Sequence, residues 1–174
     1  MAGLARRGVV AGLLALGGCG FRPLYAPDAG NAPGPASRGL ASVYVPVMPE
    51  RSGQLLRQAL QQRLEGTGEG VQKQYELIAS FGVASEGIGI LRDSSVTRTR
   101  LTGTANWYLR DLTPERKVVA QGTSRVLDGF NIANQQFFAA TLDAETATRR
   151  IASSLADQIV IQVAAYFQKQ AAPA

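Results

Sequence analysis

The strictest constraint on the fold is a run at residues 96–110 in which apolar and polar side chains alternate. Leu101, Ala105, Trp107 and Leu109 fall on one side of the run, and threonine, asparagine and arginine side chains fall on the other. A period of two is the geometry of a β-strand, and the apolar side predicts a sheet with one buried face and one face in water. We therefore expect a second layer over the apolar face, with Trp107 in the core and not in a site.

Weaker alternation predicts three further strands. Residues 75–83 and 117–127 flank the first run, and the short connections make all three strands sequential and antiparallel. Gly87 and Gly89 should break or curve the far end of the strand at 75–83. Alternating valines predict one more strand, at residues 43–47, placed at a sheet edge or ending early because it contains a proline.

Two segments have the apolar spacing of amphipathic helices. Residues 49–64 carry leucines on one stripe, and a longer helix from about Asp143 to Gln168 repeats apolar residues every four positions. The element order predicts an α/β (α+β) two-layer sandwich, with both helices on one face of a mostly antiparallel four-stranded sheet. We expect this single domain to span residues 40–170, followed by a frayed tail at 171–174.

The start of the chain has the form of a bacterial lipoprotein signal. Two arginines precede a short apolar run that ends in Leu-Gly-Gly before Cys19. The run is about half the ~20 apolar residues that a membrane-spanning helix needs, so a cleaved signal is favoured over an anchor. We predict a signal peptide at residues 1–18, lipidation of Cys19, and a flexible, Pro- and Gly-rich tether that completes residues 19–39. The alternative for Cys19 is a buried free thiol.

The absence of histidine excludes most catalytic and metal sites. Histidine is the commonest general base and metal ligand, and the single cysteine allows no intramolecular disulfide. The carboxylate pairs Asp111/Glu115 and Asp143/Glu145 are better explained by a hairpin turn and by the acidic first turn of a helix. We expect no enzyme, no metal and no cofactor other than the covalent lipid.

Positive charge is concentrated between residues 92 and 125, where seven Arg and Lys residues outnumber three acidic ones. Arg98 and Arg100 share a strand face. Lys117 and Arg125 lie on the outward face of the next strand, so all four could form one surface. Guanidinium groups suit phosphate oxygens, whereas the simpler interpretation is an ordinary solvated sheet face. The candidate binding residues are Arg92, Arg98, Arg100, Lys117 and Arg125.

A specific motif follows the cysteine. The sequence Gly20-Phe21-Arg22-Pro23-Leu24-Tyr25, together with the predicted element order, resembles the LptE (RlpB) family of lipopolysaccharide-assembly lipoproteins. The resemblance implies two helices against a four-stranded sheet and a non-enzymatic role. It implies a plug in the lumen of the LptD β-barrel that helps the barrel assemble and binds lipopolysaccharide on its way to the cell surface. A barrel lumen is polar, which suits a chain with only 18% charged residues and many neutral polar ones.

The family resemblance gives the candidate residues more specific roles. Arg92 would lie near the tip with which the family contacts lipopolysaccharide, and our hypothesis is that Arg92, Arg98 and Arg100 hold its phosphates. Gly20 stands in place of the aspartate that retains many lipoproteins in the inner membrane, so the outer membrane is favoured, with the lipid anchored on its periplasmic side. Docking against the barrel wall or the sheet edge, in preference to a mere spacer, is predicted for Phe21, Pro23, Leu24 and Tyr25.

Two other functions stay open. An accessory or adaptor lipoprotein of another envelope transport or assembly complex would share the signal, the tether and the domain. A nucleic-acid binder is suggested only by the net charge of +5, which falls by two when the signal is removed. Export and the lack of an aromatic and basic stacking surface argue against nucleic acid.

Overall fold

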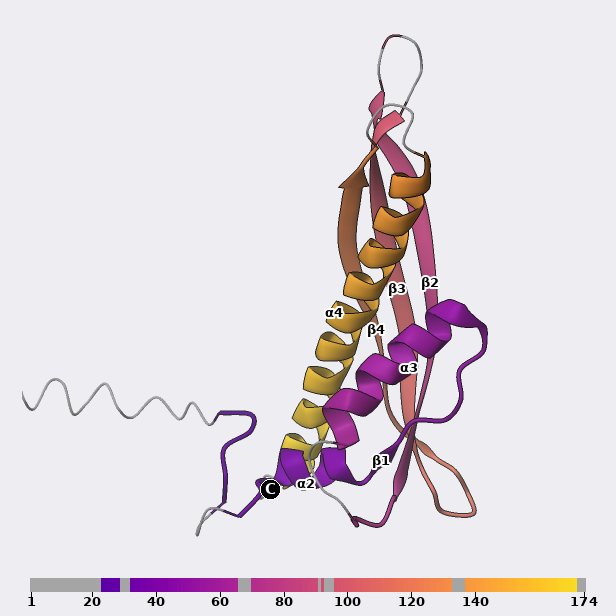
Figure 1. Cartoon of the computed structure of the whole chain (residues 1–174). Coiled ribbons are helices and arrows are strands. Elements are labelled where there is room, and N and C mark those ends of the chain that lie inside the picture. The colour runs from indigo at the N-terminus through magenta and orange to yellow at the C-terminus, as the bar shows by residue number, and fades with distance from the viewer. Residues whose placement is uncertain are drawn as a thin grey trace, which may run out of the picture.

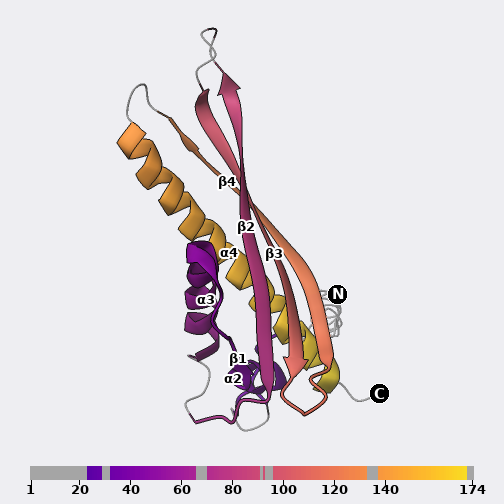
Figure 2. The ribbon, with the colours of Figure 1, turned by 90° about the vertical axis from the view of Figure 1, so that its right-hand side faces the viewer.

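The computed structural model describes residues 23–28, 32–65, 70–90, 92, 96–132 and 137–171. Figure 1 shows an elongated molecule in which two helices lie against one face of a long, twisted sheet, and Figure 2 shows the two layers from the side. The elements in chain order are α2 (Pro35–Ala41), β1 (Val43–Tyr44), α3 (Glu50–Glu65), β2 (Tyr75–Ile90), β3 (Val96–Asp111), β4 (Val118–Asn131) and α4 (Phe137–Ala171).

The sheet confirms the predicted sandwich and is mixed. Its strand order is β1-β2-β3-β4, with β2, β3 and β4 antiparallel as predicted and β1 parallel to the start of β2. The strand expected at residues 43–47 is only Val43–Tyr44, because Pro46 has no N–H to give to a ladder. The Pro46 carbonyl instead accepts a hydrogen bond from Arg57 Nε at 3.1 Å. The chain thus leaves the sheet early and enters α3.

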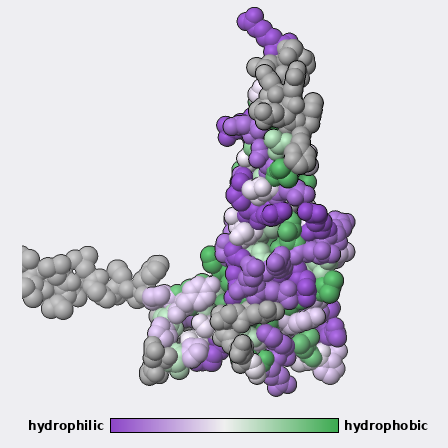
Figure 3. Space-filling view, viewed as in Figure 1, coloured by the Kyte–Doolittle hydropathy of each residue, from purple (hydrophilic) through white to green (hydrophobic). Residues whose placement is uncertain are grey.

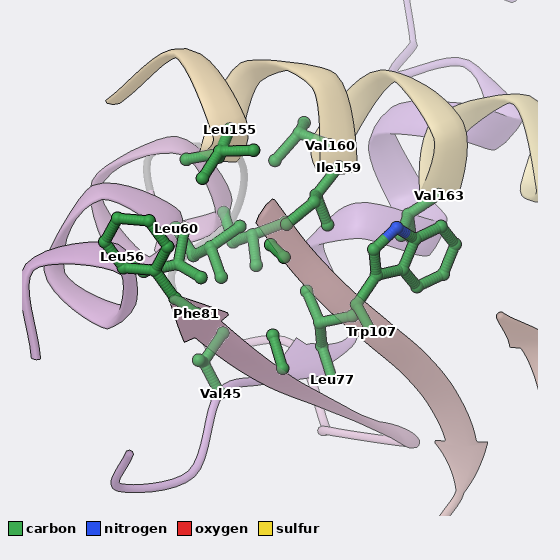
Figure 4. Packing of buried hydrophobic residues seen from close by; sticks show 14 of the residues in the cluster. Val45, Leu56, Leu60, Leu77, Phe81, Trp107, Leu155, Ile159, Val160 and Val163 are labelled. Carbon is green, nitrogen blue, oxygen red and sulfur yellow. The ribbon is translucent and has the colours of Figure 1, made fainter. Parts of the chain in front are cut away.

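The core lies between the helices and the inner face of the sheet, as Figure 4 shows. Trp107 is 4% exposed, which confirms its prediction as a core residue. Its indole N–H donates to Gln162 Oε1 at 3.2 Å, and Gln162 Nε2 donates to Ser124 Oγ at 3.3 Å, so the polar atom is satisfied. The largest fully buried side chains of the two long helices are Leu56, Leu60, Leu64, Ile151, Leu155, Ile159 and Val163.

One helix was not predicted. Residues 35–39, expected to belong to a flexible tether, form most of α2, with Pro35 in its first turn, where a missing N–H costs nothing. Ala36 and Leu40 are buried. Gly39 lies against the ring of Phe167 so closely that a Cβ would clash with it. The tether prediction is therefore wrong for these residues, since α2 packs on α4.

The second long helix begins earlier than expected. It starts at Phe137, six residues before Asp143, and ends at Ala171. Its first described side chains, such as the half-exposed Leu142, make no part of the buried stripe, which begins at Ala147. The apolar repeat therefore predicted only the part of α4 that packs on the core, and not the first turns of the helix.

An ion pair fastens β4 to α4. Asp128 Oδ2 accepts from Arg150 Nε at 2.8 Å, Oδ1 accepts from Arg150 at 3.1 Å, and the Gly129 N–H also donates to Oδ1. The hydrogen bond from Arg150 is the main cause that lowers the pKa of Asp128 below its ordinary value of 3.8. A depressed carboxyl pKa contributes stability above the unfolded value, and this contribution is lost as the pH falls through the folded value.

Asp128→Asn is therefore expected to reduce the acid sensitivity of the fold. Between about pH 7 and about pH 3, the urea midpoint of the natural chain should fall further than that of the variant, because only the natural chain loses this carboxylate. Glu50→Gln is the matched control, since Glu50 is exposed and forms no ion pair with any described residue. Equal losses in Asp128→Asn and the natural chain would show that the pair adds no pH-dependent stability.

Candidate functional site

The candidate basic residues begin at the end of the β2–β3 hairpin, which projects past the first turn of α4 (Figure 1). Arg92 lies between the two strands and is exposed. The ladder shifts register on both sides of Gly89, which confirms the expected irregularity at Gly87 and Gly89. A Cβ at Gly89 would meet Thr97 Oγ1 at 2.5 Å, so glycine permits the close approach of the strands below the tip.

Arg98 and Arg100 extend this basic surface along β3. Both are exposed and alternate with the buried Leu101, so they point away from the helices. Arg100 pairs with Glu86 across the ladder, and its NH1 lies 3.5 Å from Glu86 Oε2 in an exposed and therefore weak ion pair. Arg98 forms no ion pair with any residue that the structure describes. We call Arg92, Arg98 and Arg100 the tip cluster.

Arg125 lies on the same face but farther from the tip. It pairs with Thr104 in the β3–β4 ladder, four residues along β3 from Arg100, or about 13 Å. Its side chain lines a shallow open groove of about 570 Å³ on the uncovered face of the sheet. The groove exists because Gly82 and Ala84 of β2 add little bulk there. Its lining is partly polar, from Glu86, Arg125 and threonine hydroxyls, and partly apolar, from Val83 and Ala84.

Lys117 does not join the other candidates. It lies in the β3–β4 turn, next to Val118, which pairs with Arg110, whereas Arg98 pairs with Asn131 at the other end of β4. The length of β4 separates these levels by about 40–45 Å. Lys117 Nζ also lies 3.0 Å from Glu115 Oε2. The prediction that one surface includes Lys117 is wrong, because residues can share a strand face and still lie far apart along it.

The first acidic pair lies in the β3–β4 turn, as expected, whereas Asp143 and Glu145 lie beyond the first turn of α4, which carries no acidic residue, so that part of the prediction is wrong. Asp111 Oδ1 accepts from Thr113 Oγ1 at 2.7 Å and from the Lys117 N–H at 3.0 Å, which fixes the β3–β4 turn. Glu145 accepts from Arg51 of α3 and lies near Arg149. Within the described ranges, no three His, Cys, Asp or Glu side chains gather as a metal site would require.

The N-terminal segment 23–28 is seated on the domain. The Ala26 N–H donates to the Pro23 carbonyl at 3.0 Å and closes a turn, and Leu24 is partly buried against the core. Tyr25 stays 49% exposed, and burial is the main cause that raises its pKa, with the nearby Asp157 adding to it. Leu24 is thus occupied by its own domain, whereas Pro23 and Tyr25 present exposed surface. Cys19 and Phe21 lie outside the described residues.

One contact of this segment could not be foreseen from periodicity. Arg38 NH1 lies 2.7 Å from Asp28 Oδ2 and also donates to the Pro33 carbonyl, which holds the segment against α2. The contact depends on α2, which the Pro- and Gly-rich composition concealed. Among the helices in the described ranges, none is both long enough and apolar enough to cross a membrane.

Comparisons with known proteins agree with this architecture. The family model described as LptE, lipopolysaccharide-assembly, matches residues 40–163. A protein of Caulobacter crescentus CB15 described as a lipoprotein is 25% identical, with a TM-score of 0.63 over 80% of this chain and 98% of that one. A comparison with curated proteins finds no match.

Two more distant solved structures share the fold. The rare lipoprotein B of Shewanella oneidensis is 12% identical, with a TM-score of 0.54 over 74% of this chain and 96% of that one. A minor lipoprotein of Acinetobacter baumannii is 15% identical, with a TM-score of 0.52 over 71% of this chain and 88% of that one. At these identities the likeness is one of fold.

Proposed function

The chain belongs to the LptE family of lipopolysaccharide-assembly proteins, and from this membership we propose that it is an outer-membrane lipoprotein that fills the lumen of an LptD-type β-barrel. In this role it helps the barrel to assemble and binds lipopolysaccharide on its way to the cell surface. The family is one of assembly factors, which supports a non-enzymatic role. The covalent lipid on Cys19 attaches the protein to the periplasmic side of the membrane.

A polar exterior supports the place in a barrel. The uncovered face of the sheet carries Ser80, Thr102, Thr104, Asn106 and Thr123 along its middle. The outer side of the helical layer is largely hydrophilic, with smaller apolar patches (Figure 3). Because the lumen of an outer-membrane barrel is polar, a plug needs such surfaces on both of its faces. Exposed Pro23 and Tyr25 are available to dock against the barrel wall.

The observation that carries lipopolysaccharide binding is the tip cluster. Arg92 lies between β2 and β3, Arg98 and Arg100 follow along the end of β3, and the weak pair with Glu86 is the one ion pair that these three make with described residues. Lipopolysaccharide carries phosphates, and guanidinium groups bind phosphate oxygens through charge-assisted hydrogen bonds. Arg125 extends the cationic surface into the groove on the same face.

Reversal of the tip cluster tests this function. The variant Arg92→Asp/Arg98→Asp/Arg100→Asp is expected to bind purified lipopolysaccharide at least tenfold more weakly, because each hydrogen bond between charged groups is worth about 1.5–3 kcal/mol. Affinity would be measured at low and at high salt, since exposed charges are screened. The tagged variant should still bring down a large outer-membrane barrel from detergent-solubilised envelopes, because the two polar faces assigned to the barrel lumen extend far beyond the tip.

The matched control reverses three cations at the other end. Arg116, Lys117 and Lys169 are exposed and change the net charge by the same amount when each becomes aspartate. This control should bind lipopolysaccharide as the natural chain does. An equal loss of affinity in both variants would show a general effect of charge and not a local site. Unchanged affinity in the tip variant would show that the tip cluster does not bind lipopolysaccharide. If the natural chain does not bring down a barrel, the proposal that it fills the lumen of an LptD-type barrel is contradicted.

A further inference from the structure

A second hollow lies far from the tip, where segment 23–28 meets α2 and the two long helices. This groove has a volume of about 350 Å³ and is lined by Tyr25, Leu40, Arg63, Asp157, Val160 and Ile161. We call it the anchor groove. It contains none of the residues that the proposed function uses for lipopolysaccharide.

The anchor groove offers apolar surface whose charged neighbours are already paired. Arg63 Nε donates to Asp157 Oδ1 at 2.6 Å and Arg63 NH2 donates to Oδ2 at 2.9 Å, a two-point contact that leaves no net charge at the groove. Ile161 is 52% exposed, although the adjacent Val160 is 7% exposed. A large apolar side chain left open beside a hollow favours an apolar occupant and gives no attraction to a charged one.

The chain itself supplies such an occupant at short range. Phe21 lies four residues before Tyr25, which lines the groove, and an extended chain covers at most about 14 Å over that distance. The turn closed by Ala26 and Pro23 fixes the point from which the preceding residues start. Leu24 packs on the core, and Asp28 pairs with Arg38 at 2.7 Å, so this starting point is held on both sides of Tyr25.

We propose that the ring of Phe21 fills the anchor groove and packs on Val160 and Ile161. The occupant is a residue of this chain because it begins beside the groove, is aromatic, and needs no charged partner. Seating Phe21 places Cys19 within two residues, or about 7 Å of chain, of a fixed point on α4. The lipid then leaves the domain at a defined position instead of through a loose linker. This inference goes beyond the proposed function and requires neither the barrel nor lipopolysaccharide.

Photocrosslinking of the full-length protein in its producing cells tests the inference. Phe21 would be replaced by p-benzoylphenylalanine, which keeps an aromatic ring and couples on illumination to neighbouring C–H bonds. The expected product is an intramolecular crosslink from position 21 to the α4 segment around Val160 and Ile161, identified by mass spectrometry of the digested protein. A predominant crosslink to another protein, to lipid or to another element would overturn the proposal, as would the absence of a crosslink.

Two further substitutions give matched controls. Ile161→Asp removes apolar surface from the groove and is expected to reduce the crosslink at least tenfold, whereas Leu142→Asp should leave it unchanged. Both side chains are about half exposed on the same helix, and nineteen residues, or about 28 Å, separate them. Equal crosslink yields in the two variants would contradict the proposal that Phe21 fills the anchor groove. The crosslink should persist even where the tip variant and the barrel test contradict the proposed function, so the two failures are distinguishable.

Discussion

Exchange of residues 1–19 for a secretory signal that is cleaved without lipidation is expected to move the protein from the membrane fraction to the soluble periplasmic fraction. Two or more acyl chains hold a protein stably, because each buried methylene contributes about 0.8 kcal/mol. In the described ranges, no helix could replace that anchor. Fractionation by ultracentrifugation measures the shift, which should be nearly complete.

The exchange of the whole signal avoids a confounding effect of a simple Cys19→Ala substitution. An uncut signal would keep its apolar run and could hold the chain at a membrane by itself. Intact-mass measurement of the natural chain is the companion control, and it should give a mature protein that begins at Cys19 and carries acyl chains. An uncut N-terminus or an unmodified Cys19 in the native host would contradict the lipoprotein assignment.

Leu155→Ala is expected to lower the free energy of unfolding by about 2–5 kcal/mol. Leu155 is fully buried in the middle of α4, between the sheet and α3 (Figure 4). The substitution removes buried apolar surface and leaves a cavity in a core that no intramolecular disulfide supports. Since the total stability of a domain is about 5–15 kcal/mol, this is a large share of it. Urea unfolding followed by Trp107 fluorescence measures the change.

Leu142→Ala provides the comparison for this core substitution. It makes the same chemical change on the same helix, but Leu142 is 50% exposed, so the free energy of unfolding should change by less than about 0.5 kcal/mol. A loss in Leu142→Ala as large as that in Leu155→Ala would mean that α4 does not bury the stripe described here.

The elements that sequence periodicity predicted well are those whose burial follows a simple repeat. The strand expected at residues 96–110 is β3 at Val96–Asp111, and the helix expected at 49–64 is α3 at Glu50–Glu65. In β3 every second side chain faces the core, and in α3 the side chains on one stripe along the helix face it. The hidden element was α2, whose composition is typical of a linker. The helix is stabilised by tertiary contacts, because Leu40 is buried and Gly39 packs directly against the Phe167 ring. No local sequence pattern reveals these contacts.

The candidate site was predictable to the same degree. Arg98 and Arg100 lie on the expected face because strand alternation fixes which side each residue points to. Lys117 was misplaced because alternation says nothing about position along a strand, and the register with Arg110 decides that. The anchor groove needed the packing of α2 on α4, so neither Val160 nor Ile161 could be identified from the sequence.

The length of β2 sets how far the arginines of the hairpin lie from the N-terminal segment. The strand begins beside β1 and α2, near the N-terminal segment, and runs for 16 residues, about 50 Å, to the hairpin that carries the arginines. A bilayer with its headgroups is about 40–45 Å thick. The hairpin therefore carries its guanidinium groups away from the N-terminal segment by a distance comparable to that thickness.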